Sequence, residues 1–295
     1  MQFPSGKIKP HVGWLALPFA LIFFAYFVLP LVLTIIVSFW DYTDYAIIPA
    51  LIFDNYIYIF DGCLSYEGGL CLTFKTYLST FFFCFFTWLI TLVLGFCVAY
   101  FLAFYVNSIP LQVCLFLVCT IPFWTSNVIR MVSWIPLLGR NGLINEFFLS
   151  LGITDQPIEW LLYSSFSVIL ALVHLYTLFM IVPIFNSMIR IDRSIVEAAY
   201  DAGASHLQII FNIIIPLSKT GIIIGSIFVV TVVMGDFLTI GIMGGQQLAS
   251  VGKIINTEMN YLQFPGAAAN AVILLIITIF MIYVMTKFID IRKEL

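Results

Sequence analysis

A single aspartate interrupts a long apolar stretch of the chain. Asp236 lies within residues 220–243, where no other side chain is charged. A carboxylate in such surroundings is costly and usually faces a cavity or a partner, so it could meet an ammonium group there. Trp134 and Tyr176 could add cation–π faces. Structural hydrogen bonding for the aspartate, and packing for the two aromatic residues, are the alternative roles.

A second set of spaced residues predicts docking to another protein. The segment "EAAYDAGASHLQIIFNIIIPL", residues 197–217, is polar and centred on a glycine. Ser194 is the expected N-cap, with Glu197 three residues later as in a capping box. Gly203 permits a left-handed or close-packed turn, and Pro216 should end or kink the second helix. A short helix with a small-residue face suits another protein's groove, and an ordinary connecting loop is the alternative.

Two cysteines could form a disulfide. Cys63 and Cys71 share one predicted loop, with Gly68 and Gly69 between them. They could pair if that loop faces an oxidising compartment, although a sequence cannot supply the required geometry. The other four cysteines are expected to be packed thiols: Cys84, Cys97, Cys114 and Cys119.

Motifs for catalysis are not found in the sequence. No G-x-x-x-x-G-K-[ST] phosphate loop, H-E-x-x-H or G-x-S-x-G pattern occurs. The three histidines, His11, His174 and His206, are scattered, so no metal site is expected. His174 is expected to pack through a hydrogen bond. The chain is therefore predicted to be a non-enzymatic protein that does not itself hydrolyse ATP and needs no cofactor.

Composition places these residues in a membrane protein. Of 295 residues, 62% are hydrophobic and only 9% are charged, against about 25% charged in ordinary soluble proteins. A soluble domain cannot hide that much apolar surface, so membrane lipid is the expected solvent. The formal net charge of −3 argues against nucleic acid as a partner. The whole chain, residues 1–295, is predicted to be one all-α membrane domain.

Gaps between charged residues predict six transmembrane helices, since a span needs about 20 apolar residues. Two of them fit between Lys75 and Arg130, with the turn at residues 107–110. The other four are residues 14–39, 160–189, 220–243 and 259–286.

The distribution of Lys and Arg predicts the orientation. With the N-terminus inside, eight basic residues fall on the inner side: Lys7, Lys9, Arg190, Arg193, Lys219, Lys287, Arg292 and Lys293. Four fall on the outer side: Lys75, Arg130, Arg140 and Lys253. Both termini are therefore expected inside, and residues 190–217 form a cytoplasmic loop.

That loop resembles the signature loop of ABC-importer permeases. The family pattern reads EAA, three residues, Gly, nine residues, Ile, one residue, Leu-Pro. This chain matches it, apart from Ile215 in place of Leu, at Glu197, Ala198, Ala199, Gly203, Ile213 and Pro216. The resemblance implies a coupling helix within residues 190–217 that sits in a cleft of an ATPase subunit.

Two further stretches resemble permeases of spermidine/putrescine-type importers, especially the first of their two paired permeases: "IPFWTSNVIRMVSWIPLLGRNGLIN", residues 121–145, and "GDFLTIGIMGG", residues 235–245. The resemblance implies a type I importer permease in the bacterial inner membrane. It also implies a second permease, two ATPase subunits that bind ATP and Mg, and an extracytoplasmic binding protein. A polyamine is the implied cargo, while related permeases carry iron, opines or phosphonates. A proton-coupled secondary transporter is the alternative from a different class, but it leaves the loop pattern unexplained.

Overall fold

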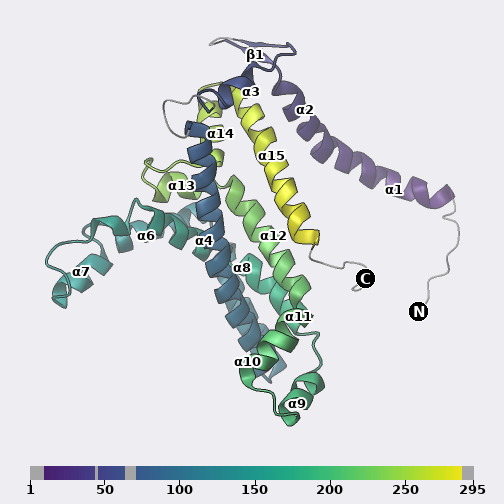
Figure 1. Cartoon of the computed structure of the whole chain (residues 1–295), viewed down its shortest axis with the longest axis vertical. Helices are drawn as coiled ribbons and strands as arrows, with labels where there is room; N and C mark the ends of the chain where they lie inside the picture. Colours follow the sequence, from purple (N-terminus) through teal and green to yellow (C-terminus); the bar gives the residue numbers. More distant parts are fainter. Residues whose placement is uncertain (1–9, 44–45, 64–70, 288–295) are drawn as a thin grey trace.

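The computed structural model of the chain describes residues 10–43, 46–63 and 71–287 (Figure 1). The described residues are mostly helical, and two short strands pair antiparallel. Segments labelled η are 3₁₀ or π turns. In chain order the elements are α1 (Pro10–Phe23), η1 (Phe24–Val28), α2 (Leu29–Val37), β1 (Asp41–Tyr42), β2 (Ile47–Ile48), α3 (Asp54–Ile59), α4 (Leu72–Tyr100), η2 (Phe101–Tyr105), α5 (Ile109–Thr120), η3 (Ile121–Trp124), α6 (Asn127–Leu138), α7 (Leu143–Ser150), η4 (Glu159–Leu161), α8 (Ser165–Met188), α9 (Arg193–Asp201), α10 (His206–Ile209), η5 (Ile210–Ile214), α11 (Ile215–Leu217), α12 (Lys219–Gly235), α13 (Leu238–Met243), α14 (Val251–Asn260) and α15 (Phe264–Lys287).

Helix length and composition agree with the predicted number of spans. Within the described residues, four helical segments are long and apolar enough to cross a membrane: Leu17–Val37, Leu72–Tyr105, Glu159–Met188 and Phe264–Lys287. Two bent pairs raise the number to six if each pair is one span: Ile109–Trp124 with Asn127–Ser150, and His206–Leu217 with Lys219–Gly235.

The bent pairs correct two details of the sequence prediction. The third predicted span is not continuous, because the chain turns by 88° between η3 and α6. The fifth bends by 70° at Ser218, two residues after Pro216, which the sequence marks as the kink. Pro216 cannot donate a backbone hydrogen bond, and the π turn η5 directly precedes its helix. The fifth span also ends at Gly235 rather than continuing to residue 243.

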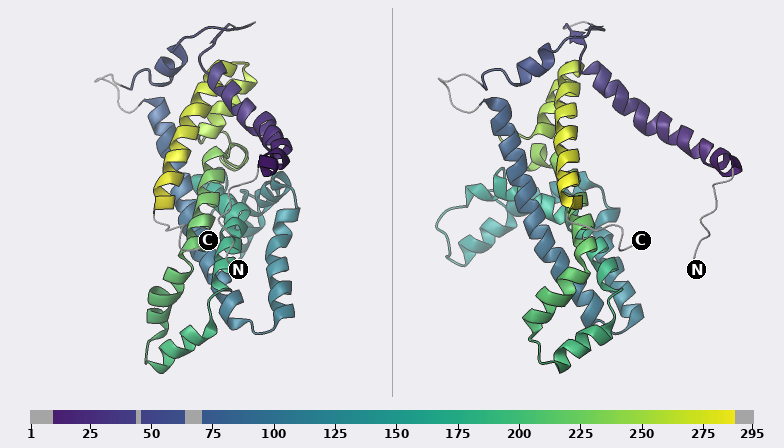
Figure 2. Two further views of the ribbon diagram at one scale, coloured as in Figure 1. Left: turned by 90° about the vertical axis from the view of Figure 1, so that its right-hand side faces the viewer. Right: turned by 45° about the vertical axis from the view of Figure 1, so that its right-hand side comes forward.

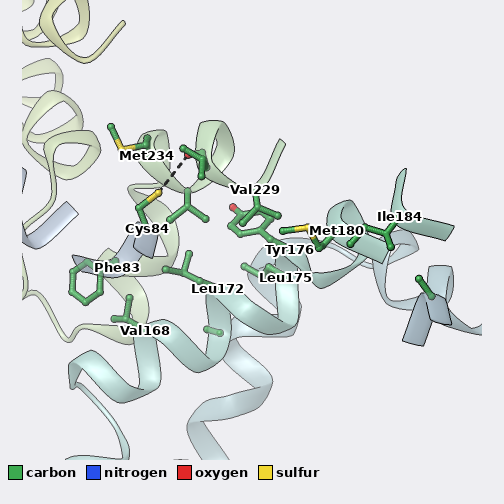
Figure 3. Packing of buried hydrophobic residues seen from close by; sticks show 14 of the residues in the cluster. Phe83, Cys84, Val168, Leu172, Leu175, Tyr176, Met180, Ile184, Val229 and Met234 are labelled. Atoms are coloured by element: carbon green, nitrogen blue, oxygen red, sulfur yellow. Dashed lines mark hydrogen bonds between the residues drawn. The ribbon is translucent and has the colours of Figure 1, made fainter. Parts of the chain in front are cut away.

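The core lies where α4, α8 and α12 pack together (Figure 3). Met180 of α8 is fully buried between two glycines. A Cβ at Gly225 of α12 would lie 2.8 Å from the Met180 sulfur, and one at Gly95 of α4 would lie 2.7 Å from the Met180 Cγ. A side chain at either glycine would force Met180 to move, so small residues let the three helices approach closely, as is common within membranes.

The first span diverges from this core. Figures 1 and 2 show α1 and α2 leaning away from the bundle, in contact with it near α15. None of the most apolar window of Leu17–Val37 is buried within the chain. A helix that is apolar on all sides must be covered by lipid or by another protein, so this span needs a covering from outside the chain.

The two ends of the bundle carry different structures. The α9–α11 segment lies at one end, and the β1–β2 hairpin with α3 and α14 lies at the other (Figure 1). Near the second end, Cys63 and Cys71 are joined by a disulfide. Gly68 and Gly69 lie outside the described residues. The predicted cytoplasmic loop and the disulfide-bearing loop are thus at opposite ends of the molecule, as they must be if they face opposite sides of a membrane.

The disulfide predicts a simple alkylation result. Protein purified under non-reducing conditions, denatured and alkylated should gain four alkyl groups, because two of the six cysteines are bonded. Reduction before alkylation should raise this to six by intact mass. Cys63→Ser should leave Cys71 reactive without a reductant, so that five groups are gained with or without reduction. Six groups added to the unreduced wild-type protein would exclude the bond.

Candidate functional site: a coupling loop and an intramembrane carboxylate

The predicted coupling loop begins with a capped helix. The backbone N–H of Ser194 donates to Asp192 Oδ1 at 3.0 Å, and this bond lowers the pKa of the exposed Asp192 carboxyl. Asp192 is therefore the N-cap of α9. The prediction that Ser194 is the N-cap, with Glu197 completing a capping box, is wrong. Glu197 instead lies exposed on the second turn of the helix.

Gly203 closes α9 in a left-handed conformation. Its φ is +81°. The Gly203 N–H donates to the Tyr200 carbonyl at 2.9 Å, and the Ala204 N–H donates to the Ala199 carbonyl at 3.0 Å. This pair of bonds is the Schellman arrangement that ends many helices. No atom lies within 4 Å of a Cβ built at Gly203, so the position needs glycine for its backbone angle and not for space.

The second half of the loop has its own cap, which the sequence analysis missed. Ser205 and Gln208 form a reciprocal capping box at the start of α10, and the S-x-x-Q spacing was a visible signal for it. The chain then runs through η5 and α11 into α12. Ile213 is half-buried beneath this segment, whereas Pro216 is exposed.

The loop presents an apolar outer surface. Ala199 packs inward against the core, but Ala198 is exposed. Around it, Leu207 is 66% and Phe211 64% exposed, and Ile195 and Tyr200 are also exposed. Large apolar side chains gathered on one exposed end indicate a protein interaction surface.

Polar bonds tie the loop to the end of α4. The His206 ring lies between two tyrosines, with Nδ1 2.7 Å from the Tyr200 hydroxyl and Nε2 3.2 Å from the Tyr100 hydroxyl. Arg193 donates from Nη1 to Asn107 Oδ1 at 2.6 Å, in the turn after η2. No local sequence pattern predicts this tether, because its members come from three separate stretches. These bonds therefore join α9 and α10 to the end of the second span.

Breaking the tether should weaken that mechanical link. His206→Ala removes both tyrosine bonds, and neutral hydrogen bonds are worth about 1 kcal/mol each. We expect transport per ATP hydrolysed to fall about fivefold in the purified importer, with all subunits retained. Tyr100→Phe removes only the bond to α4 and should give a similar loss if that bond is the link. The double variant should then be no worse than His206→Ala alone, since either change already breaks this bond. Loss of the ATPase subunits from His206→Ala would instead indicate a docking role.

The carboxylate of Asp236 lies at the break between α12 and α13. Its Oδ2 accepts hydrogen bonds from the Tyr176 hydroxyl and the Thr239 hydroxyl, both at 2.6 Å. Its Oδ1 accepts from the Thr239 backbone N–H at 2.9 Å. The structure thus brings together two of the predicted pathway residues, Asp236 and Tyr176, and adds Thr239. Asp236 is partly exposed, whereas Tyr176 is buried, so Tyr176 reaches the site through its hydroxyl rather than its ring face.

Trp134 lies in a neighbouring pocket of about 360 Å³. Its indole Nε1 donates to His174 Nδ1 at 3.1 Å, which gives the histidine the hydrogen-bonded role expected of it. Arg130 lines the same pocket and is only 8% exposed. The prediction that Arg130 belongs to an outer loop is therefore wrong. Among the residues searched in the described part of the chain, no three His, Cys, Asp or Glu side chains are grouped to hold a metal.

Comparisons with known proteins agree with this fold. No protein-family model matches the chain. The chain is 33% identical over 279 residues to the spermidine/putrescine transport system permease protein PotB of Salmonella typhimurium (strain SL1344), covering 94% of this chain and 90% of that protein. The Escherichia coli (strain K12) PotB is 38% identical over 188 residues, 63% of this chain and 67% of that protein.

A solved structure shares the fold across nearly the whole chain. It is a bacterial alginate ABC transporter in complex with an alginate pentasaccharide-bound periplasmic protein, with a TM-score of 0.69. The likeness covers 94% of this chain and 92% of that one at 14% identity, which supports the type I importer permease fold. The apolar helices, the fold and the extent of identity lead to one conclusion: this chain is an inner-membrane transport subunit that belongs to the spermidine/putrescine-type family of ABC-importer permeases.

Proposed function

We propose that this chain forms half of the translocation pathway of an ATP-driven importer for a polyamine-like cation. The observation that carries the proposal is the exposed α9–α11 loop, which has the family spacing from Glu197 to Pro216 and ends α9 at a left-handed Gly203. In this proposal the loop, residues 190–217, sits in a cleft of an ATPase subunit. Its exposed Leu207 and Phe211 would be covered there.

The proposed assembly has this chain, a second permease, two ATPase subunits and an extracytoplasmic binding protein. The ATPase subunits would bind ATP and Mg, and both termini of this chain would lie in the cytoplasm. The position of the α9–α11 loop and the disulfide at opposite ends of the bundle supports the orientation, because disulfides persist in oxidising compartments.

In the proposed cycle, closure of the ATPases moves α9. The His206 and Arg193 tether passes the movement to the end of the second span, and the close glycine contacts around Met180 make α4, α8 and α12 move together. The two permeases then rock between outward-open and inward-open states. Cargo released by the binding protein enters between them and passes the Asp236 carboxylate.

A polyamine is the cargo that the relatives' names and the carboxylate support. An ammonium group loses water in a narrow path, and an oppositely charged group offsets part of that cost. Iron, opine and phosphonate cargoes are the alternatives within the same architecture. The family assignment and the loop favour ATP-driven import over a proton-coupled secondary transporter.

Reconstitution of the whole importer tests the proposal. The complex purified with its binding protein should accumulate labelled spermidine or putrescine in proteoliposomes only with ATP, and a protonophore should not stop it. A complex with inactive ATPase subunits is the control. Uptake driven by a pH gradient without ATP would contradict the importer, whereas a different small molecule retained by the purified binding protein would change the cargo alone.

A further inference from the structure

Arg130 is a buried cation whose bonds within the chain are incomplete. It lies on α6 with 8% of its surface exposed. One terminal nitrogen, Nη2, donates to the neutral amide oxygen of Asn127. Its Nε is buried and has no acceptor among the described residues, and no carboxylate in that part of the chain forms an ion pair with it. A charged side chain inside a membrane protein usually faces a partner of opposite charge or a water-filled cavity.

The pocket beside Arg130 offers hydrogen-bond donors. Because an indole N–H can only donate, the bond from Trp134 means that His174 Nδ1 carries no proton and that neutral His174 has its N–H at Nε2. Thr177, the remaining hydroxyl of the lining, already donates to the Val173 carbonyl. Arg130 and His174 therefore line a pocket whose lining contains no carboxylate. Such a site suits a carboxylate, which accepts several charge-assisted bonds at once.

We propose that the Arg130 pocket binds an aspartate or glutamate side chain of the second permease subunit. The inference rests on the proposed function for the identity of that partner. Under the proposed function the cargo is a cation, so the cargo itself does not supply the carboxylate that binds Arg130.

The surroundings of the pocket favour a protein as the source. Phe123, which lines it, is half-exposed, and the adjacent Trp124 and the nearby Ile129 are 83% and 64% exposed. Figures 1 and 2 show α6 and α7 extending away from the helix bundle, and their packing partners within the chain are few. An exposed apolar and aromatic arm that carries an arginine matches the composition of protein interfaces, in which aromatic residues and Arg are enriched.

The pairing would also serve the pathway. Arg130 lies within electrostatic reach of Tyr176, the residue that donates to Asp236. An unpaired guanidinium there would repel an incoming cation. A carboxylate from the second permease cancels that charge, so the path becomes favourable to cations once the two permeases are assembled.

Arg130→Met tests the proposal, because the presence and the absence of a partner carboxylate predict different effects on assembly with the second permease. If a partner carboxylate binds Arg130, the methionine leaves that acid buried and unpaired, and co-purification of the second permease should fall about tenfold. If Arg130 has no partner, an apolar side chain of similar length should leave assembly unchanged or improve it. Arg140→Met is the matched control, because Arg140 is exposed and its ion pair with Glu159 contributes little. Since retention of a subunit is measured without cargo, the result is separate from the spermidine uptake test.

Crosslinking identifies the source of the carboxylate. In the complex that carries Arg130→Lys, a carbodiimide should join the introduced amine to one Asp or Glu of the second permease, and mass spectrometry should locate it. Reversing the charge of that acid should restore assembly to Arg130→Glu. Unchanged assembly of Arg130→Met would overturn the proposal. So would loss of a bound phospholipid from Arg130→Met with the second permease retained.

Discussion

Gly203→Val is expected to leave the permease in the membrane but to reduce ATP-coupled transport by about tenfold or more. The backbone at Gly203 has φ +81°, a conformation that costs an ordinary side chain about 1–2 kcal/mol and a β-branched one more. Since 1.4 kcal/mol is a tenfold change in an equilibrium, the Schellman turn should be depopulated by about tenfold or more. The α9–α10 corner would then no longer hold its shape against the ATPase.

Two variants separate the backbone angle from general damage. Gly203→Asn should be much milder, because asparagine tolerates the left-handed region and the space around Gly203 is open. Gly152→Val places the same kind of strain at φ +68°, also in open space, in the loop after α7, and should not reduce ATPase binding. The measurements are subunit retention, ATPase rate and uptake in proteoliposomes. Normal uptake by Gly203→Val would refute the coupling role.

Asp236→Asn is expected to reduce uptake of a cationic cargo by about tenfold or more at limiting concentration. The amide keeps the shape, and its NH₂ group can donate to the Tyr176 and Thr239 hydroxyls, which reverse their roles. The substitution therefore removes mainly the charge. A hydrogen bond to a charged group is worth about 1.5–3 kcal/mol, and that attraction to an ammonium group is lost. Assembly and docking of the binding protein should be retained.

Variants of the residues that bond Asp236 separate the effect of its charge from the effect of its hydrogen bonds. Tyr176→Phe and Thr239→Val each remove a donor to Oδ2 but keep the carboxylate. If the charge acts on cargo, both should transport much better than Asp236→Asn. If Asp236 only holds the break before α13 through its hydrogen bonds, Tyr176→Phe and Thr239→Val should be at least as harmful as Asp236→Asn, and all three should lower the yield of folded complex. Full uptake by Asp236→Asn would remove this carboxylate from the pathway.

Local patterns in the sequence predicted most of the architecture. A span needs a fixed length of apolar chain, so charge-free stretches marked the helices, although the fifth ends at Gly235 and not at residue 243. The turn in the coupling loop, residues 190–217, needs a left-handed backbone at position 203, and the glycine there is a direct sequence signal for it. Where competing caps lay close together the sequence was misleading: Asp192, not Ser194, accepts the bond at the start of α9.

Contacts between distant segments could not be predicted in this way. Hydropathy does not distinguish a buried Arg130 from one in a loop, because the 88° bend that buries it depends on packing against α8 and α13. The link of His206 to Tyr100 spans 106 residues, and that of Asp236 to Tyr176 spans 60. Both bonds are short-range and directional, so they exist only once the helices are in register.

The sequence by itself therefore determined the membrane as solvent, the set of helices and the glycine-centred loop, since each depends on the chemistry of neighbouring residues. Only the tertiary structure decided which polar groups meet: Tyr176 and Thr239 at the carboxylate, the two tyrosines at His206, and Trp134 at His174 beside Arg130. The physical reason is that buried polar groups must find partners, and the packing of helices far apart in the chain sets which partners are within reach.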